Sequence, residues 1–207
     1  MTRILLVEDS RITRNSIQQM LSFQPDFQIV AAIENAANAE ILCLRGNINL
    51  ILMDVCTADN ESGLEAAANI KRRYPQIKII IMTSMPEHSF IQKARAAGCN
   101  SFWYKEYGDQ NLLDVIVRTV NGESVWPDAV PSVAVGLTVS DAFSERELVI
   151  MRELAKGEKY DDIAQHLGIT VNTVKYHIKN LLQKTGYKNT LQLVAEVVEK
   201  QMILPKY

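Results

Sequence analysis

The chain has 207 residues, of which 47% are hydrophobic, and its mean hydropathy of −0.04 is ordinary for a globular protein. No apolar run approaches the roughly 20 residues that a membrane-spanning helix needs, and no signal-peptide pattern precedes the first strand-like run, so we expect no membrane association. Three scattered cysteines, Cys43, Cys56 and Cys99, lack metal-ligand spacing and favour reduced thiols in a cytoplasmic protein.

Charge is distributed unevenly along the chain, although the formal net charge is only −2. Between Ile163 and Ala195 there is no Asp or Glu, and this stretch carries Lys175, Lys179, Lys184 and Lys188. A basic stretch in a mildly acidic protein predicts an anionic partner for that stretch alone.

Strand-like and helix-like patterns alternate over the first part of the chain. The strand-like runs lie near residues 3–7, 28–33, 49–54, 77–82 and 101–104. The helix-like segments lie near residues 10–22, 35–45, 63–74, 86–97 and 109–121. Such alternation predicts an α/β fold, a (βα)5 doubly wound parallel sheet with helices on both faces, in a domain covering residues 1–121.

Residues 122–143 break both periodicities with Gly122, Pro127, Pro131 and Gly136, which predicts a linker. The segment is only weakly polar. We therefore expect apolar residues within it, Val125, Trp126 and Val130, to be able to dock on a neighbouring domain.

Residues 144–207 show only helical patterns and predict a four-helix domain. Ser144 and Glu147 form a capping box before a helix that runs to about residue 156. Further helices are predicted near 160–167, 171–185 and 190–202, and Thr170 is the predicted cap of the helix 171–185. Two helices joined by a turn that contains glycine are typical of the helix-turn-helix motif, whose second helix enters the DNA major groove.

Chemically active side chains follow the predicted strands of the first domain: Glu8 and Asp9, Asp54, Thr83, and Lys105. The carboxyl ends of parallel strands meet at one edge of an open sheet, where ligands bind, so we expect these side chains to lie together. Neighbouring carboxylates repel one another, and oxygen ligands without His or Cys favour Mg2+ over zinc. An acidic Mg2+ site beside a hydroxyl and an amine is equipped to receive a phosphoryl group.

With these residues in this order, residues 1–121 resemble the CheY-like receiver domain of two-component response regulators. The resemblance implies that Asp54 accepts a phosphoryl group from the histidine of a sensor kinase. It also implies that Glu8, Asp9 and Asp54 bind Mg2+, with the backbone carbonyl of Cys56 as a further ligand. A metal there would neutralise the phosphoryl oxygens that the carboxylates repel.

The same resemblance assigns the remaining site residues. Lys105 pairs with Asp54 before phosphorylation and with the phosphoryl group afterwards, and Thr83 donates a hydrogen bond to a phosphoryl oxygen. Phe102 occupies the place of the switch aromatic, which rotates inward when Thr83 moves, although a plain core aromatic would also suit this position. Such a domain catalyses its own phosphoryl transfer and dephosphorylation, but we expect the protein to be a regulator and not an enzyme.

The segment after the acceptor departs from the receiver pattern. The family usually has Met-Pro shortly after the Asp and a Gly eight residues after it, whereas here Gly63 is nine residues after Asp54 and no Pro intervenes. We expect the loop 55–62 to be longer and more flexible, with negative charge added by Asp59 and Glu61. Metal affinity and the lifetime of the phosphoryl group are the properties that this departure affects.

Residues 144–202 resemble the LuxR/NarL-type DNA-binding domain, most clearly in Phe143–Glu147, Leu167–Ile169 and Thr173–His177. The resemblance implies a homodimer that binds double-stranded DNA through the third helix. The expected DNA contacts come from that helix and its flanks: Thr170, Asn172, Thr173, Lys175, Tyr176, Lys179, Lys184 and Lys188. In the family the last helix forms the dimer contact, which here presents Leu191, Val194 and Val198, although this apolar face could equally be core.

Several functions compete for this sequence. The first is a cytoplasmic NarL-type transcriptional regulator switched by phosphorylation of Asp54, and the second is a regulator with an atypical receiver that works without phosphorylation. A haloacid-dehalogenase-type phosphatase would need a second Asp two residues after Asp54, where Cys56 stands. A dinucleotide-binding site would need a glycine-rich turn after the first strand, and that turn is absent.

Overall fold

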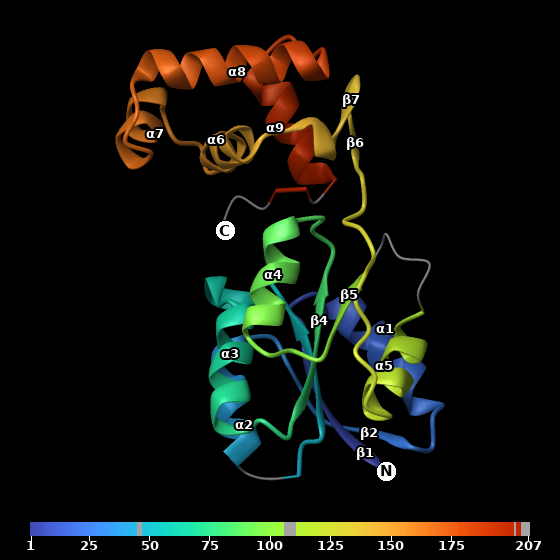
Figure 1. The fold of residues 1–207 in the computed structure, drawn as a ribbon. Helices are drawn as coiled ribbons and strands as arrows, with labels where there is room; N and C mark the ends of the chain where they lie inside the picture. Colours follow the sequence, from blue (N-terminus) through green and yellow to red (C-terminus); the bar gives the residue numbers. More distant parts are fainter. Residues whose placement is uncertain (45–46, 106–110, 201, 204–207) are drawn as a thin grey trace. The chain divides into compact units, whose positions relative to one another are not determined.

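The structure, a computed structural model, describes residues 1–44, 47–105, 111–200 and 202–203, apart from the side chains of Asn60 and His88. The chain folds as two compact units, Met1–Val130 and Pro131–Tyr207 (Figure 1). The boundary falls inside residues 122–143, the predicted linker, so part of that segment belongs to each unit. Within the described residues, no helix has the length and apolar character needed to cross a membrane.

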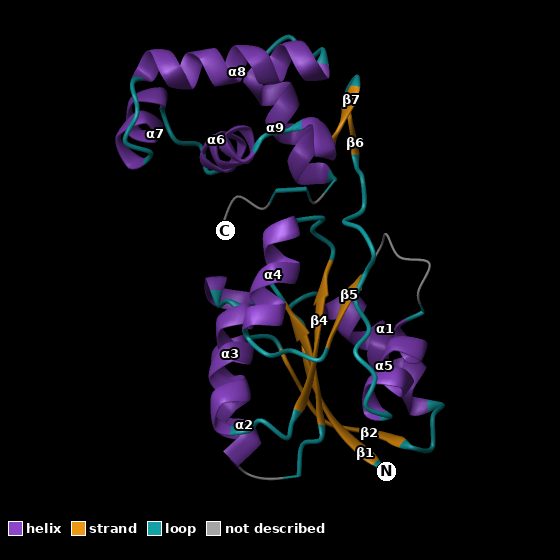
Figure 2. Cartoon of the chain, in the orientation of Figure 1, coloured by secondary structure: helices purple, strands orange, loops and turns teal. Residues whose placement is uncertain are grey.

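The first unit contains the predicted sheet of parallel strands, and its strand order is β2-β1-β3-β4-β5 (Figure 2). The strands are β1 (Thr2–Val7), β2 (Phe27–Ile33), β3 (Leu50–Asp54), β4 (Lys78–Thr83) and β5 (Ser101–Tyr104). The central strand β3 is buried along its whole length, which explains its unbroken apolar sequence. The order reverses at β1, so β1 and β3 flank the crevice in which ligands bind.

Helices cover both faces of this sheet, with α1 (Arg11–Ser22) and α5 (Leu112–Val120) on one face and the remaining helices on the other (Figure 1). Those helices are α2 (Ala39–Leu44), α3 (Gly63–Arg73) and α4 (His88–Ala96). The predicted helix 35–45 is divided, because a short 3-10 turn, η1 (Ala36–Asn38), precedes α2. Residues 109 and 110, predicted to begin the last helix, lie outside the described residues.

The start of the predicted linker is part of the first unit. Val125 is buried in the core between the sheet and α5. Its carbonyl accepts a hydrogen bond from the backbone N–H of Phe102 (2.9 Å), and its own N–H donates to the Ser101 hydroxyl (3.0 Å). These two bonds attach Val125 to the edge strand β5.

The second unit contains α6 (Glu145–Ala155), α7 (Tyr160–His166), α8 (Val171–Thr185) and α9 (Thr190–Glu199). The capping box of Ser144 and Glu147 is present, and Thr170 caps α8 as predicted. Asn189 caps α9, because its side chain accepts from the N–H of Gln192 (3.0 Å). A core of aliphatic side chains holds these helices together, with Ile150, Ile163, Val174 and Val197 fully buried.

A hairpin that the sequence did not predict precedes α6. It consists of the antiparallel strands β6 (Ala134–Val135) and β7 (Thr138–Val139), and the 3-10 turn η3 (Ser140–Ala142) follows it. Leu137 N–H donates to the Thr185 carbonyl (2.9 Å), and a Cβ at Gly136 would lie 2.0 Å from the same oxygen. The end of α8 therefore requires glycine at this turn, and the hairpin belongs to the helical unit rather than to a linker.

Candidate functional site

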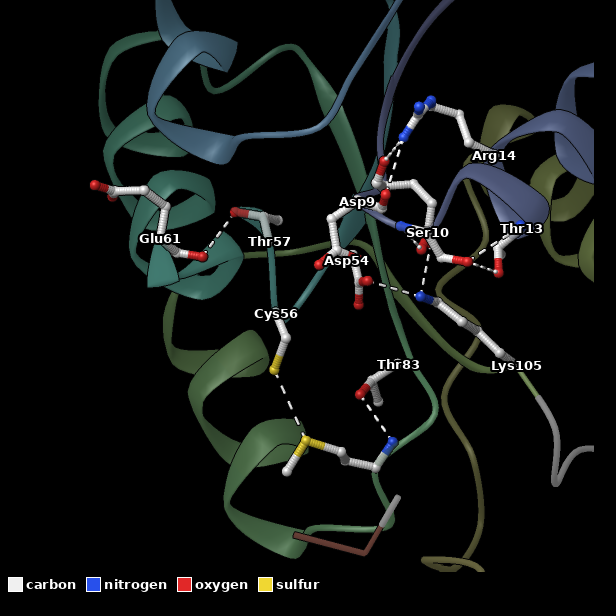
Figure 3. Close-up of polar contacts among 12 residues, drawn as sticks. Asp9, Ser10, Thr13, Arg14, Asp54, Cys56, Thr57, Glu61, Thr83 and Lys105 are labelled. Carbon is white, nitrogen blue, oxygen red and sulfur yellow. Dashed lines mark hydrogen bonds and ion pairs between the residues drawn. The ribbon is translucent and has the colours of Figure 1, made fainter. Parts of the chain in front are cut away.

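The side chains predicted to act together meet at one edge of the sheet (Figure 3). Parallel pairing places Val7 beside Met53 and Asp54 beside Met82, so Glu8 and Asp9, which follow β1, come next to Asp54. Pairing of Thr83 with Tyr104 brings Lys105 to the same edge. The register of the strands thus assembles the site from residues far apart in the sequence.

Three carboxylates form the centre of this site. Glu8, Asp9 and Asp54 each offer an oxygen within 4.8 Å of the others. Glu8 is 0% exposed and Asp54 5%, while Asp9 faces solvent. Negative charges this close and this poorly hydrated need a cation between them, and an oxygen-only donor set with one open side fits Mg2+.

Lys105 provides positive charge within the site. Its Nζ lies 2.6 Å from Glu8 Oε2 and 2.7 Å from Asp54 Oδ2. Burial alone would lower the pKa of Lys105, but the two carboxylates outweigh it and raise the pKa above its usual value. Burial raises the pKa of Asp54 to about 7, against the opposing attraction of Lys105.

Thr83 and Phe102, the predicted switch pair, are both buried. The Thr83 hydroxyl accepts a hydrogen bond from the Met85 N–H at 3.0 Å (Figure 3). Phe102 packs edge-on against Tyr104 and is fully enclosed, a position that also suits a plain core aromatic.

Cys56 lies beside the acceptor, but its thiol turns away from the carboxylates. The Sγ atom is 3.7 Å from Met85 Sδ, and this contact is the dashed line that leaves Cys56 in Figure 3. Burial raises the pKa of the Cys56 thiol, so the group is neutral at ordinary pH. Only the backbone carbonyl of Cys56 could serve as a ligand for a hard cation. Met85, which forms this sulfur pair, was not singled out from the sequence because it reads as an ordinary core residue.

The loop 55–62, which carries the additional residue, forms a closed turn. Cys56 and Ser62 pair as an isolated antiparallel bridge, and Thr57 N–H donates to the Glu61 carbonyl (3.2 Å). The short 3-10 turn η2 (Ala58–Asn60) lies between them. Asp59 adopts a left-handed backbone conformation with φ of 60°, and this turn accommodates the additional residue.

Gly63 closes the loop against the acceptor strand. Its N–H donates to the Val55 carbonyl at 2.9 Å, and a Cβ at this position would lie 1.8 Å from the carbonyl oxygen of Asp54. Only glycine fits so close to the acceptor backbone. The glycine therefore keeps its place beside Asp54 although it stands one residue later than the receiver pattern predicts.

The second unit presents a basic helix face. Val174, Ile178 and Leu181 point into the core, while Lys175 and Lys179 lie on the exposed side of α8. Asn172, Tyr176 and Lys188, also predicted to contact DNA, are exposed. Two lysines one helical turn apart next to an aromatic side chain give a face suited to phosphates and base edges.

Several predicted DNA contacts already have partners within the chain. Lys184 Nζ donates to Glu147 Oε2 (2.8 Å) and to the Ala142 carbonyl (2.9 Å). The hydroxyl of Thr170 accepts from Thr173 N–H (3.1 Å) and is 2.8 Å from the Thr173 hydroxyl. Lys184 therefore connects α8 with the start of α6, which weighs against its predicted contact with DNA.

The apolar face of α9 divides between core and surface. Leu193 and Val197 are buried, whereas Leu191 is 78% exposed. Val194 and Val198 are half-buried. Within the described residues Leu191 is thus not part of the core, and it remains available for the predicted dimer contact.

Comparison with known proteins agrees with both halves of this description. The family described as "Response regulator receiver domain" matches residues 4–117. The family described as "Bacterial regulatory proteins, luxR family" matches residues 141–197. The response regulator protein VraR of Staphylococcus aureus is 31% identical over 211 residues, which cover 97% of this chain and 98% of that protein. The chain belongs to the LuxR family of response regulators.

Solved structures share the fold of this LuxR-family regulator. A LuxR-family two-component response regulator from an Aurantimonas species is 25% identical, with a TM-score of 0.56 over 60% of this chain and 89% of that one. RcsB from Salmonella enterica serovar Typhimurium, bound to a promoter in the presence of the phosphomimetic BeF3−, has a TM-score of 0.56. It is 17% identical and covers 95% of this chain and 98% of its own, so this likeness concerns the fold alone.

As a LuxR-family response regulator, the protein combines a receiver domain with a DNA-binding helix-turn-helix domain. Its family acts in transcription regulation and does not consist of classical enzymes.

Arg14 was missed by sequence reasoning, although it contacts the backbone of the acidic pair. The signal that could have revealed it is a basic residue one turn into the helix that follows Glu8-Asp9.

Proposed function

We propose that a sensor histidine kinase phosphorylates Asp54 and thereby switches the DNA-binding activity of this regulator. The observation that carries the proposal is the placement of Asp54 within 4.8 Å of the Glu8 and Asp9 carboxylates and 2.7 Å from Lys105 Nζ. An Asp54 oxygen would attack phosphorus as the bond to the kinase histidine breaks. Lys105 would then exchange its contact with the carboxylate for one with the phosphoryl group.

A divalent cation, Mg2+ by its preference for oxygen, would be held by the carboxylates of Glu8, Asp9 and Asp54 and the backbone carbonyl of Cys56. When bound, it supplies charge neutralisation at the phosphoryl oxygens. The chain's own residues do the rest: Asp54 provides the nucleophile, and Thr83 donates its hydroxyl to a phosphoryl oxygen. The domain would in this way catalyse its own phosphorylation and dephosphorylation.

Movement of Thr83 toward the phosphoryl group would draw Phe102 with it and shift the population toward the DNA-binding form. In that form a homodimer would place α8 in the major groove, with Lys175 and Lys179 on DNA. The remaining contacts proposed at the helix start and its flanks are Thr170, Asn172, Thr173, Tyr176 and Lys188.

For the dimer contact we propose α9, where Leu191 is exposed and Val194 and Val198 border it. A large aliphatic side chain left in solvent next to half-buried valines suits burial against a second copy. The whole assembly would function in the cytoplasm, where its DNA and the catalytic part of its kinase are found.

The deciding experiment measures DNA affinity and oligomeric state with and without beryllofluoride and Mg2+, using Asp54→Ala as control. Dimer formation and tighter DNA binding that disappear in Asp54→Ala are the expected result. If DNA binding is intact but unresponsive, the regulator works without phosphorylation. The additional residue at the turn around Asp59 is the feature that favours this second function.

A further inference from the structure

Arg14 lies against the backbone of the acidic pair, in a role that the phosphoryl chemistry does not use. Its Nη1 donates to the carbonyls of Glu8 (2.6 Å) and Asp9 (3.2 Å), and its Nη2 lies 2.6 Å from Glu34 Oε1. The side chain is only 12% exposed. With the Ser10 N–H donating to Glu8 Oε1 at 3.2 Å, these bonds fix the orientation of the metal-binding turn after β1.

The hydrogen bonds continue from Glu34 to the turn after the acceptor. Ala58 N–H donates to the Glu34 carbonyl (2.9 Å), and Ala36 N–H donates to the Thr57 hydroxyl (3.0 Å). Asn35 Nδ2 donates to Asp59 Oδ2 (2.9 Å). The segment after β2 therefore holds the turn after β1 on one side and the loop 55–62 on the other.

Thr57, like Arg14, connects two segments of this hydrogen-bond network. It is buried, and its hydroxyl both accepts from Ala36 N–H and donates to the Glu61 carbonyl at 2.7 Å. The side chain thus bonds the loop internally and to the segment after β2. We call the connected set Arg14, Glu34, Asn35, Ala36 and Thr57 the loop belt.

We propose that the loop belt sets the divalent-cation affinity of the site, with Arg14 and Thr57 as positioning residues for the ligands around Asp54. This inference rests on the proposed phosphorylation function. Partners that orient metal ligands typically change metal affinity by about 10- to 100-fold when they are lost. The belt also explains how a loop with an additional residue can keep its backbone ligand in place.

The direction in which Arg14→Gln changes the divalent-cation affinity separates a positioning role of Arg14 from an effect of its charge. Arg14 carries a positive charge near a cation site, so Coulomb repulsion alone predicts that Arg14→Gln binds a divalent cation more tightly. Loss of positioning predicts weaker binding, because the Glu8 and Asp9 carbonyls lose their donor. A fall in affinity therefore cannot result from removal of the charge.

The test measures Mn2+ binding to the full chain by electron paramagnetic resonance, with Mg2+ as competitor and circular dichroism to verify folding. We expect about tenfold weaker Mn2+ binding in Arg14→Gln and Thr57→Val, and near wild-type binding in Thr57→Ser, which keeps the hydroxyl. Arg73→Gln is the control for charge, because it removes an equal charge from an exposed arginine that also pairs with a carboxylate, Glu40 (2.6 Å).

Unchanged or tighter Mn2+ binding in Arg14→Gln, with Thr57→Val also unchanged, would overturn the loop belt while leaving the proposed function intact. A wild-type protein that binds neither Mn2+ nor beryllofluoride would instead overturn the proposed function, and this inference with it. If Arg14→Gln fails to fold, the comparison of Thr57→Val with Thr57→Ser decides the question.

Discussion

The indole ring of Trp126 stacks on the ring of Phe102, with 6.4 Å between their centroids and 28° between their planes. The guanidinium of Arg95, on α4, lies over the same indole at 4.3 Å from its centroid. Trp126 follows Val125, whose backbone is bonded to β5. The proposed switch aromatic thus touches the first residues that leave the sheet, so a movement of Phe102 changes the surroundings of Trp126.

This contact makes Trp126 a natural reporter of switching. The chain has two tryptophans, so Trp103→Phe leaves Trp126 as the single emitter. We expect its emission to change in wavelength or intensity when beryllofluoride and Mg2+ are added, because Phe102 and Arg95 are its immediate neighbours. The same variant carrying Asp54→Ala should show no change. Constant emission while beryllofluoride binding is detected independently would contradict the coupling.

A methyl group at Gly63 should unfold the receiver locally. Its Cβ would lie 1.8 Å from the Asp54 carbonyl oxygen, so the strand or the helix must move, at a cost of about 3 kcal/mol or more. Gly98→Ala is the comparison: its backbone, unlike that of Gly63, is left-handed (φ of 78°), and its nearest neighbour is 3.8 Å away, so we expect its free energy of unfolding to fall by about 1–2 kcal/mol from backbone strain alone.

Urea unfolding followed by tryptophan emission measures both variants, because Trp103 and Trp126 belong to the first unit. Equal losses in Gly63→Ala and Gly98→Ala would mean that the close approach to Asp54 carries no special cost.

The ion pair between Glu147 and Lys184 should make the second unit sensitive to acid. Burial alone would raise the pKa of Glu147, but hydrogen bonds from Lys184 and Ser144 outweigh it and hold the pKa below its usual value. The folded state then binds fewer protons than the unfolded state around the usual carboxyl pKa of about 4.3. This contribution is present above that pH and is lost as the pH falls through the lower pKa of the folded state.

Glu147→Gln isolates this charge, because Gln can still complete a capping box. We expect the free energy of unfolding of Glu147→Gln to be lower than that of the wild type by about 1–2 kcal/mol at pH 7. Below pH 4 this difference between the two proteins should become smaller. Urea titrations followed by the amide NMR signals of α8 would measure it. A variant as stable as wild type at pH 7 would show that the ion pair is dispensable.

The lysines of the basic stretch differ in their contacts within the chain, and this difference predicts different roles in DNA binding. Lys175→Ala and Lys179→Ala should each lower the slope of log affinity against log salt by about 1 if they contact phosphates. Lys184→Ala should leave that slope unchanged and destabilise the unit, since its Nζ bonds Glu147 and Ala142. Titration of a random-sequence duplex at several salt concentrations tests this, and a slope lowered equally by Lys184→Ala would refute the assignment.

Much of the fold could be predicted because its signals are local. Unbroken apolar runs placed the strands within one residue, and the hydroxyls of Ser144 and Thr170 marked the starts of α6 and α8. The acidic pair, Asp54, Thr83 and Lys105 could be grouped because parallel strands bring their carboxyl ends together. The roles assigned to these residues and to the DNA-facing side chains stay predictions.

What the sequence did not reveal depends on partners distant in the chain. The hairpin β6–β7 forms against the end of α8, so residues 133–143 alone look like a linker. Arg14 owes its position to carbonyls and to Glu34, neither of which leaves a periodic pattern. The exposure of Leu191 follows from how α9 packs, since Leu193 and Val197 fill the core in its place.

The turn at Asp59 also bears on how receivers are classified. Val55 and Gly63 fix the two ends of the loop, and the left-handed residue between them takes up the difference in length. Spacing between an acceptor aspartate and the next glycine therefore does not show by itself whether that glycine lies against the acceptor strand. Homologues with insertions at this turn are better judged by whether their glycine still reaches the acceptor carbonyl.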